Sequence, residues 1–249
     1  VVGPQGDQGV PGLGAVVFDR APLLTDDMNS DYSVGSVWVD RSTNRLYILE
    51  DNTANAAVWT IAAAPAVTYA LGDTGPAGGF VFYVTEDGLR GLEAAPEDLS
   101  TTVEGVETFT FKWFNDIFAD TSAKGDGVGA GAMNTMLIIA NQGADSTTYA
   151  AGIAANLVIT HSGVDYGDWY LPSKFELNLM WLNLADPLGD GRTAGFDSDS
   201  VGGFALDFYW SSSQSSSNVA WYQFFGNGVQ SDSYVYKYNA LRVRAVRAF

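Results

Sequence analysis

The chain has 249 residues, 47% of them hydrophobic and 13% aromatic, so it is long and apolar enough to bury a substantial core instead of remaining disordered. Its net charge of −17 repels phosphate and anionic lipid at long range, which argues against a nucleic-acid-binding protein. The absence of cysteine excludes disulfides, thiolate metal sites and cysteine nucleophiles, and no apolar run of about 18 residues predicts a membrane span.

The first residues carry a glycine period of three. Residues 3–14 read GPQGDQGVPGLG, with glycine at positions 3, 6, 9 and 12. This is the collagen repeat, in which three chains surround an axis where only glycine fits. Four triplets are too few to be stable alone, and a Gly/Pro linker is the alternative. We predict a collagen-like stub over residues 1–15, the end of a longer stalk, and therefore a homotrimer.

Residues 16–70 have the pattern of a small β-rich neck. The run RLYILE alternates Leu46 and Ile48 with Tyr47, the two-residue period of a half-buried strand. Because no polar side chains cluster in this region, we assign it a structural role. The predicted strands are Ser36–Asp40, Arg45–Glu50 and Ala57–Ile61.

From Gly72 the chain becomes richer in turns, and residues 71–249 are predicted as a head domain. Short strands are expected at 80–85 and 92–95, and helices at 131–142, 147–157 and 173–185. Ser173 and Glu176 have the spacing of a capping box at the start of the third helix. Apolar residues recur at helical spacing in the first helix (Met133, Met136, Leu137 and Ala140) and predict a buried stripe in the third (Phe175, Leu179 and Leu182).

Five segments, in chain order, resemble one family of domains. They are GGFVFYVTEDGLRGLEAAPED (78–98), GAGAMNTMLII (129–139), GDWYLPSKFELNLMW (167–181), YWSSSQSSSNVAW (209–221) and LRVRAVRAF (241–249). Together they resemble the domain of unknown function at the C-terminus of Legionella collagen-like adhesins, which also occurs in bacterial and phage proteins. The resemblance covers about residues 72–249.

That family is similar to the C-type lectin-like fold, in the branch of formylglycine-generating enzymes and of the variable proteins of diversity-generating retroelements. The resemblance implies an α+β head with two helices packed on a twisted antiparallel sheet. It also implies a ligand surface built from the final strands and their loops. The enzymatic relatives use cysteines for their oxidation chemistry, so that activity is excluded here.

The last forty residues combine aromatic and small polar side chains, a composition that suits recognition surfaces. If 218–225 is a strand, Tyr222 and Phe224 face outward while Trp221 and Phe225 face the core. The alternative is that these aromatics fill a sheet core or a trimer contact. The predicted ligand-binding residues are Ser216, Asn218, Tyr222, Phe224, Asn227, Ser231, Asp232, Ser233, Tyr234, Tyr236, Tyr238 and Asn239.

Other candidate sites have simpler interpretations. Arg242, Arg244 and Arg247 suggest an anion site, but buried ion pairs of the framework fit better. The four carboxylates at 186–199 do not have EF-hand spacing, so we expect a solvated loop and no metal. The sequence contains no G-x-S-x-G motif, the turn that presents a nucleophilic serine to a catalytic histidine. We therefore interpret His161 as a structural or surface residue.

The sequence therefore predicts a non-enzymatic, trimeric adhesion or receptor-binding protein without a cofactor. It would recognise a host-cell glycan or protein through its C-terminal strands, at a phage fibre tip or on a bacterial surface. The alternative is a structural virion appendage or capsid decoration whose aromatics make subunit contacts. A secreted hydrolase using Asp165, Asp168 or Glu176 is a third class, for which the sequence shows no carboxylate pairing.

Overall fold

The computed structural model describes residues 15–43, 45–62, 67–143, 147–185, 201–233 and 235–249. The chain divides into two compact units, Val1–Val67 and Thr68–Phe249, which we name the neck and the head. This division falls three residues before the boundary expected between positions 70 and 71. The collagen-like stub, apart from Ala15, lies outside the described residues.

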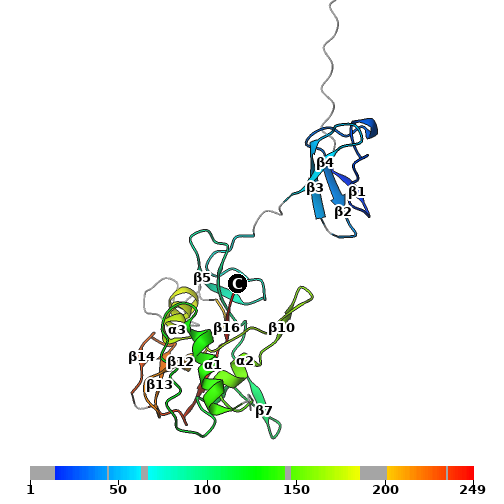
Figure 1. Cartoon of the computed structure of the whole chain (residues 1–249). Helices are drawn as coiled ribbons and strands as arrows, with labels where there is room; N and C mark the ends of the chain where they lie inside the picture. The colour runs from blue at the N-terminus through cyan, green and yellow to red at the C-terminus, as the bar shows by residue number, and fades with distance from the viewer. Residues whose placement is uncertain (1–14, 44, 63–66, 144–146, 186–200, 234) are drawn as a thin grey trace, which may run out of the picture. The chain divides into compact units, whose positions relative to one another are not determined.

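The neck contains one four-stranded sheet (Figure 1). In sheet order its strands are β1 (Val16–Phe18), β2 (Val37–Asp40), β3 (Arg45–Asp51) and β4 (Val58–Ile61). The antiparallel meander β2-β3-β4 confirms the three predicted strands. The sequence pattern does not predict β1, which pairs parallel to β2, because three residues are too few to display a period.

The core of the neck lies on one face of this sheet. Trp38 is fully buried there, with its ring centroid 5.7 Å from that of Trp59. Leu49 is buried on the same face, opposite Trp59 in the β3–β4 pairing. Leu46 and Ile48, by contrast, are on the other face and remain exposed. The predicted alternation is therefore present, and the face that carries the aromatic residues is the buried one.

The main sheet of the head has five strands. In sheet order they are β14 (Gln230–Ser231), β13 (Ala220–Phe224), β12 (Phe208–Gln214), β15 (Ala240–Arg242) and β9 (Thr110–Lys112). β12 and β15 are parallel, and the other pairs are antiparallel. The antiparallel sheet that the resemblance implies is therefore present except at one pairing, where β15 reaches β12 by a crossover and not by a hairpin.

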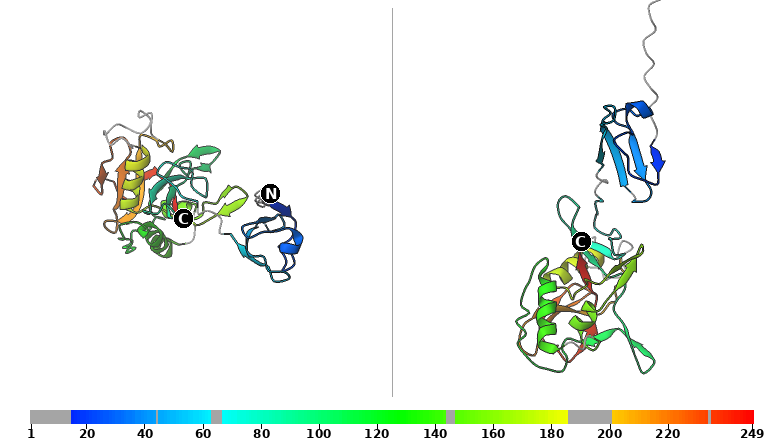
Figure 2. Two further views of the ribbon diagram at one scale, coloured as in Figure 1. Left: turned by 90° about the horizontal axis from the view of Figure 1, so that it is seen from above. Right: turned by 45° about the vertical axis from the view of Figure 1, so that its right-hand side comes forward.

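A smaller sheet and two hairpins complete the strands of the head. The sheet has the order β16 (Val246–Ala248), β6 (Gly91–Ala94) and β5 (Phe80–Val84), and β5 and β6 confirm two predicted strands. The hairpins project from the body of the head (Figure 1 and Figure 2). They are β7 (Thr101–Val103) with β8 (Val106–Thr108), and β10 (Ile159–His161) with β11 (Val164–Tyr166).

Among the described residues of the head, three α-helices accompany these sheets, at positions close to those predicted. They are α1 (Ala130–Gln142), α2 (Ala150–Ala155) and α3 (Lys174–Met180), and α3 continues as a π-helical turn, Trp181–Ala185. α1 packs on β12, and α3 packs on β12 and β13. The described part of the chain thus combines several sheets with short helices, which is compatible with the predicted α+β class.

The buried faces of α1 and α3 differ from those that apolar spacing predicts. Met133 and Met136 of α1 are exposed, and the helix buries Asn134, which bonds to the backbone of Gly125 in both directions. A polar side chain with satisfied hydrogen bonds can occupy a buried position at little cost. α3 buries Leu177, Met180 and Leu184, whereas the predicted Phe175 and Leu182 are exposed and Leu179 is partly buried.

Glu176 holds the start of two helices at once. The predicted capping box is present: the Ser173 hydroxyl accepts from the Glu176 amide, and the Ser173 amide donates to the Glu176 carboxylate at 2.7 Å. The same carboxylate accepts from the amides of Gly129 at 2.7 Å and Gly131 at 3.2 Å, at the start of α1. Burial raises the pKa of Glu176, while these donors oppose that shift.

Candidate functional site

The described residues of the predicted ligand set divide by exposure. Four are half-buried, Tyr222 is buried, and Tyr234 lies outside the described residues. The half-buried residues are Phe224, Ser231, Asp232 and Asn239. The exposed residues are Ser216, Asn218, Asn227, Ser233, Tyr236 and Tyr238.

The prediction that Tyr222 faces outward is wrong. Tyr222 is only 8% exposed, packs edge-to-face against Trp210 and donates its hydroxyl to the Ser233 carbonyl oxygen at 2.7 Å. Both faces of β13 are covered, so alternation along this strand does not separate core from surface. Trp221, predicted in the core, is half-buried under Lys174, whose ammonium lies 4.5 Å from the ring centroid. The core position of Phe225 is confirmed.

Several polar members of the set bond within their own loops. Asn227 and Ser231 each accept from the amide two residues further along. The Ser216 hydroxyl donates to Asn218, and Asp232 accepts from a neighbouring serine hydroxyl. These contacts are typical of side chains that shape turns. They leave fewer groups free for a ligand than the composition suggests.

The most distinctive exposed feature is a pair of tyrosines. Tyr236 is 42% exposed and Tyr238 is 51% exposed. Their ring centroids lie 5.4 Å apart with an interplanar angle of 15°, so the two rings are stacked. Exposed aromatic side chains gathered at one place mark interaction surfaces more often than single exposed ones do.

Between the two tyrosines, Lys237 points inward and is fully buried. Its ammonium donates to Gln214 Oε1 at 2.7 Å and to the Ala119 carbonyl oxygen at 3.3 Å. It also lies 4.1 Å from the centroid of the Trp113 ring, a cation–π contact. Burial lowers the pKa of Lys237 to about 8, and the nearby Asp120 carboxylate opposes this shift.

The backbone of the tyrosine turn is also held on several sides. The Tyr236 amide donates to Asn239 Oδ1 at 2.8 Å, and the Asn239 amide donates to the Tyr236 carbonyl oxygen at 2.8 Å. The Lys237 amide donates to the Asn218 carbonyl oxygen at 2.9 Å, and the Trp113 amide donates to the Lys237 carbonyl oxygen at 2.9 Å. The rings therefore project from a fixed backbone, and binding a ligand would require little ordering of the turn.

A hollow of about 560 Å³, with both polar and apolar lining residues, opens near the point where the turn enters β15. Ala240 is on its rim, two residues after Tyr238 and so within about 7 Å of it along the chain. Four threonines of the 101–110 segment line the hollow, and within the described part of the chain their hydroxyls make no hydrogen bond. They are Thr101, Thr102, Thr108 and Thr110.

Charged and amide groups stand beside these threonines in the same hollow. The Lys112 ammonium pairs with Asp116 at 2.6 Å, and the Thr148 hydroxyl donates to Asn115 Oδ1 at 3.0 Å. The hollow therefore offers hydroxyl, amide and carboxylate partners, the groups that bind a hydroxylated ligand by hydrogen bonds.

Sequence reasoning missed this hollow entirely. Its lining comes from the 101–116 segment, from Thr147 and Thr148, and from Ala240, which the fold alone brings together. The one local signal is the density of threonine, four in the ten residues 101–110. Such density is equally typical of an ordinary strand, so it does not by itself predict a site.

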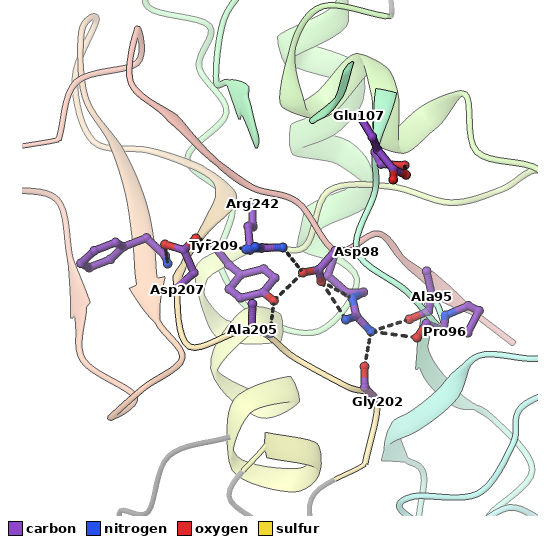
Figure 3. A network of polar contacts seen from close by, with 12 residues as sticks. Ala95, Pro96, Asp98, Glu107, Gly202, Ala205, Asp207, Tyr209 and Arg242 are labelled. Atoms are coloured by element: carbon purple, nitrogen blue, oxygen red, sulfur yellow. Dashed lines mark hydrogen bonds and ion pairs between the residues drawn. The ribbon is translucent and has the colours of Figure 1, made fainter. Parts of the chain in front are cut away.

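The arginines of the C-terminal segment belong to the scaffold. Asp98 accepts from Arg242 Nη1 at 3.0 Å, from Arg244 Nε at 2.8 Å and from the Tyr209 hydroxyl at 2.7 Å (Figure 3). Arg242 also pairs with Asp207 at 3.1 Å. Since Arg244 is 1% exposed and its charge is already paired, the framework interpretation is confirmed over that of an anion site.

The carboxylates of the hydrolase alternative are held by different partners. Asp168 accepts two hydrogen bonds from Arg247, which also donates to Glu93 at 2.7 Å. Asp165 accepts from a threonine hydroxyl at 2.6 Å, and Glu176 caps α1 and α3. None of the three predicted carboxylates hydrogen-bonds to another in the described structure.

The remaining candidates add no site among the described residues. His161 is half-buried, and its ring lies so close to Gly78 that a Cβ there would come within 2.7 Å of Nδ1. The 186–199 loop lies outside the described residues. In the described ranges, no three His, Cys, Asp or Glu side chains gather closely enough to hold a metal ion. No helix in those ranges has the length and apolarity needed to cross a membrane.

Neither a protein-family model nor a curated protein sequence matches this chain. The resemblance to the collagen-like adhesin domain and to the C-type lectin-like fold therefore stays a prediction. The α+β class, the stacked tyrosines and the threonine-lined hollow stand on the structure alone.

Proposed function

We propose that the chain is a non-enzymatic recognition protein whose head binds a neutral, hydroxyl-rich glycan. The observation that carries this proposal is the stacked pair Tyr236 and Tyr238, exposed on a turn that the buried Lys237 anchors. The threonine-lined hollow beside the pair supplies hydrogen-bonding groups for the same ligand.

The chemistry of the two surfaces favours a sugar over other ligands. Tyrosine rings provide an apolar face with a polar hydroxyl at its end, which suits a ligand that has both C–H and O–H groups. Hydroxyl and amide side chains in the hollow can each donate or accept. The net charge of −17 disfavours sulfated, sialylated or phosphorylated ligands, because they would be repelled at long range.

The proposed setting is the tip of a trimeric fibre, on a phage virion or a bacterial surface. The glycine period at positions 3–12 supports a three-chain stalk, and the α+β class of the head is compatible with a C-type lectin-like fold. Three heads on one tip would convert weak single-site contacts into firm attachment through effective concentration.

The test is binding of the full chain to an array of purified neutral bacterial surface oligosaccharides. Tyr236→Ala and Tyr238→Ala should each weaken binding about tenfold, which corresponds to about 1.4 kcal/mol. Phe175 is an exposed aromatic residue away from the tyrosine turn, on α3. Phe175→Ala is therefore the matched control and should bind as the parent does. Equal binding by all three variants, with folding intact, would remove the tyrosine pair from the site.

The hollow is tested by variants that keep strand shape and remove only a hydroxyl. Thr108→Val and Thr110→Val retain a β-branched side chain, so stability should change by less than about 1 kcal/mol. Glycan binding should fall in both. If binding falls only in the tyrosine variants, the ligand does not reach the hollow.

The alternative function is a structural appendage in which the tyrosines make subunit contacts. It is favoured by the same exposure of Tyr236 and Tyr238. Under that alternative, Tyr236→Ala and Tyr238→Ala would lower the assembled mass, whereas under glycan recognition they change binding and leave the mass unaltered.

A further inference from the structure

The neck presents an apolar sheet face that no other described part of the neck covers. The core of the neck, with Trp38, Leu49 and Trp59, lies on the opposite face. Residues directly opposite each other in paired strands share a face, and so do residues two apart within one strand. The register, together with the alternation in β4 that puts Val58 on the side of Thr60, identifies the members of the uncovered face. They come from all four strands and are Val17, Val37, Val39, Leu46, Ile48 and Val58.

Exposure confirms that this face is open. Val17, Leu46, Ile48 and Val58 are between 37% and 50% exposed, and Val37 and Val39 are half-buried. The polar members are Thr60, which pairs with Ile48, and Glu50, which accepts from the Thr60 hydroxyl at 2.9 Å near the β4 edge. Contiguous aliphatic patches of this kind are rare on monomeric soluble proteins and mark interaction surfaces.

The sequence just before the sheet indicates what covers it. Glycine recurs at positions 3, 6, 9 and 12, the repeat of a three-chain helix, and β1 begins at Val16. Val16 comes four positions after Gly12, a separation of at most about 14 Å along the chain. Three copies of the neck sheet would therefore be tethered a short distance from one common axis.

Such tethering makes even a small apolar contact effective. A short linker raises the effective concentration of neighbouring copies to the millimolar range, far above ordinary solution concentrations. The strongly acidic chains repel one another, and the apolar members of this face carry no charge to add to that repulsion.

We propose that the apolar face formed by Val17, Val37, Val39, Leu46, Ile48 and Val58 is the contact through which the necks of three copies of this chain assemble. This inference rests on the trimer that the proposed function assumes, but not on glycan binding. The collagen-like stub sets the number of chains, and the sheet face supplies the buried apolar area that fixes them in register.

Lysine substitutions on the apolar face of the neck test the inference in the full chain. Light scattering should give a trimer for the parent, one third of that mass for Leu46→Lys/Ile48→Lys, and a trimer for the control Ile61→Lys. Ile61 is comparably exposed but lies on the opposite face, since it pairs with Tyr47. A monomeric parent, a trimeric double variant, or equal dissociation of the control would each overturn the inference.

Cross-linking provides a second measurement that does not require a disruptive change. Because the chain has no cysteine, Ile48→Cys and Ile61→Cys each introduce a single thiol. A short bismaleimide should give covalent dimers from Ile48→Cys and monomers from Ile61→Cys at low protein concentration. Equal cross-linking of the two would overturn the inference. Oligosaccharide binding by Leu46→Lys/Ile48→Lys, whatever its mass, would show that the recognition proposal stands independently of this contact.

Discussion

The buried Lys237 should make the stability of the head depend on pH in a distinctive way. Its pKa is 10.5 in an exposed chain and about 8 in the fold, because burial disfavours the ammonium. Below pH 8 both folded and unfolded chains carry the proton, so the contribution of Lys237 is constant. Between pH 8 and 10.5 only the unfolded chain keeps it, and the free energy of unfolding therefore rises with pH.

The size of this rise follows from the two pKa values. At about 1.4 kcal/mol for each pH unit, the gap between 10.5 and about 8 amounts to about 3 kcal/mol. Lys237→Met retains the length of the side chain and removes the proton. Gln214 Oε1 keeps the amide and hydroxyl of Thr121 as donors, so this variant should fold.

Two measurements check the prediction in the full chain. The chain has four lysines, so NMR titration of ¹³C-labelled lysine should show one signal that titrates near pH 8 and disappears in Lys237→Met. Urea denaturation of the parent and of Lys237→Met should diverge between pH 8 and 10.5, while Lys112→Met, at an exposed lysine, should follow the parent. A constant difference between parent and Lys237→Met across that range would refute the reasoning.

Two further substitutions test the scaffold beneath the site. Gly131→Ala would place a Cβ against the Glu176 carboxylate, and should lower the free energy of unfolding by about 2–4 kcal/mol in thermal or urea denaturation. Gly167→Ala, whose Cβ would meet its nearest neighbour at 3.5 Å, is the control and should stay within about 1 kcal/mol of the parent. Asp98→Asn should cost about 3–5 kcal/mol, because the buried charge of Arg244 would lose its partner. A loss below about 1 kcal/mol would show that the other acceptors of Arg244 suffice.

Local signals predicted the parts of the fold that depend on local chemistry. The capping box of Ser173 and Glu176 is present because it needs only the first turn of one helix. The faces of α1 were not predictable in this way, since Asn134 is buried by bonds to Gly125 and to Ser212 of β12 while Met133 is exposed. The parallel pairing of β12 with β15 likewise depends on a crossover that no sequence window contains.

The candidate site was predictable only in part. The exposure of Tyr236 and Tyr238 agrees with the aromatic composition of the terminal segment. Tyr222 lies in the same segment but is buried, and its hydroxyl donates a hydrogen bond to the Ser233 carbonyl oxygen in the chain after β14. The hollow that begins at Ala240 could not be inferred, since its lining is assembled from three separate segments.

Small polar residues prove to be scaffold in this head, despite a composition that suggested recognition. All four residues from Ser211 to Gln214 are buried. Ser211 donates to the Trp221 carbonyl oxygen at 2.8 Å, and Gln214 accepts from Lys237 at 2.7 Å. The first bond ties β12 to β13 and the second ties β12 to the tyrosine turn, so substitution of Gln214 should disturb the surface indirectly. Tyr236 and Tyr238 project from that scaffold towards solvent, and replacing them should change what the head binds while leaving its stability nearly unaltered.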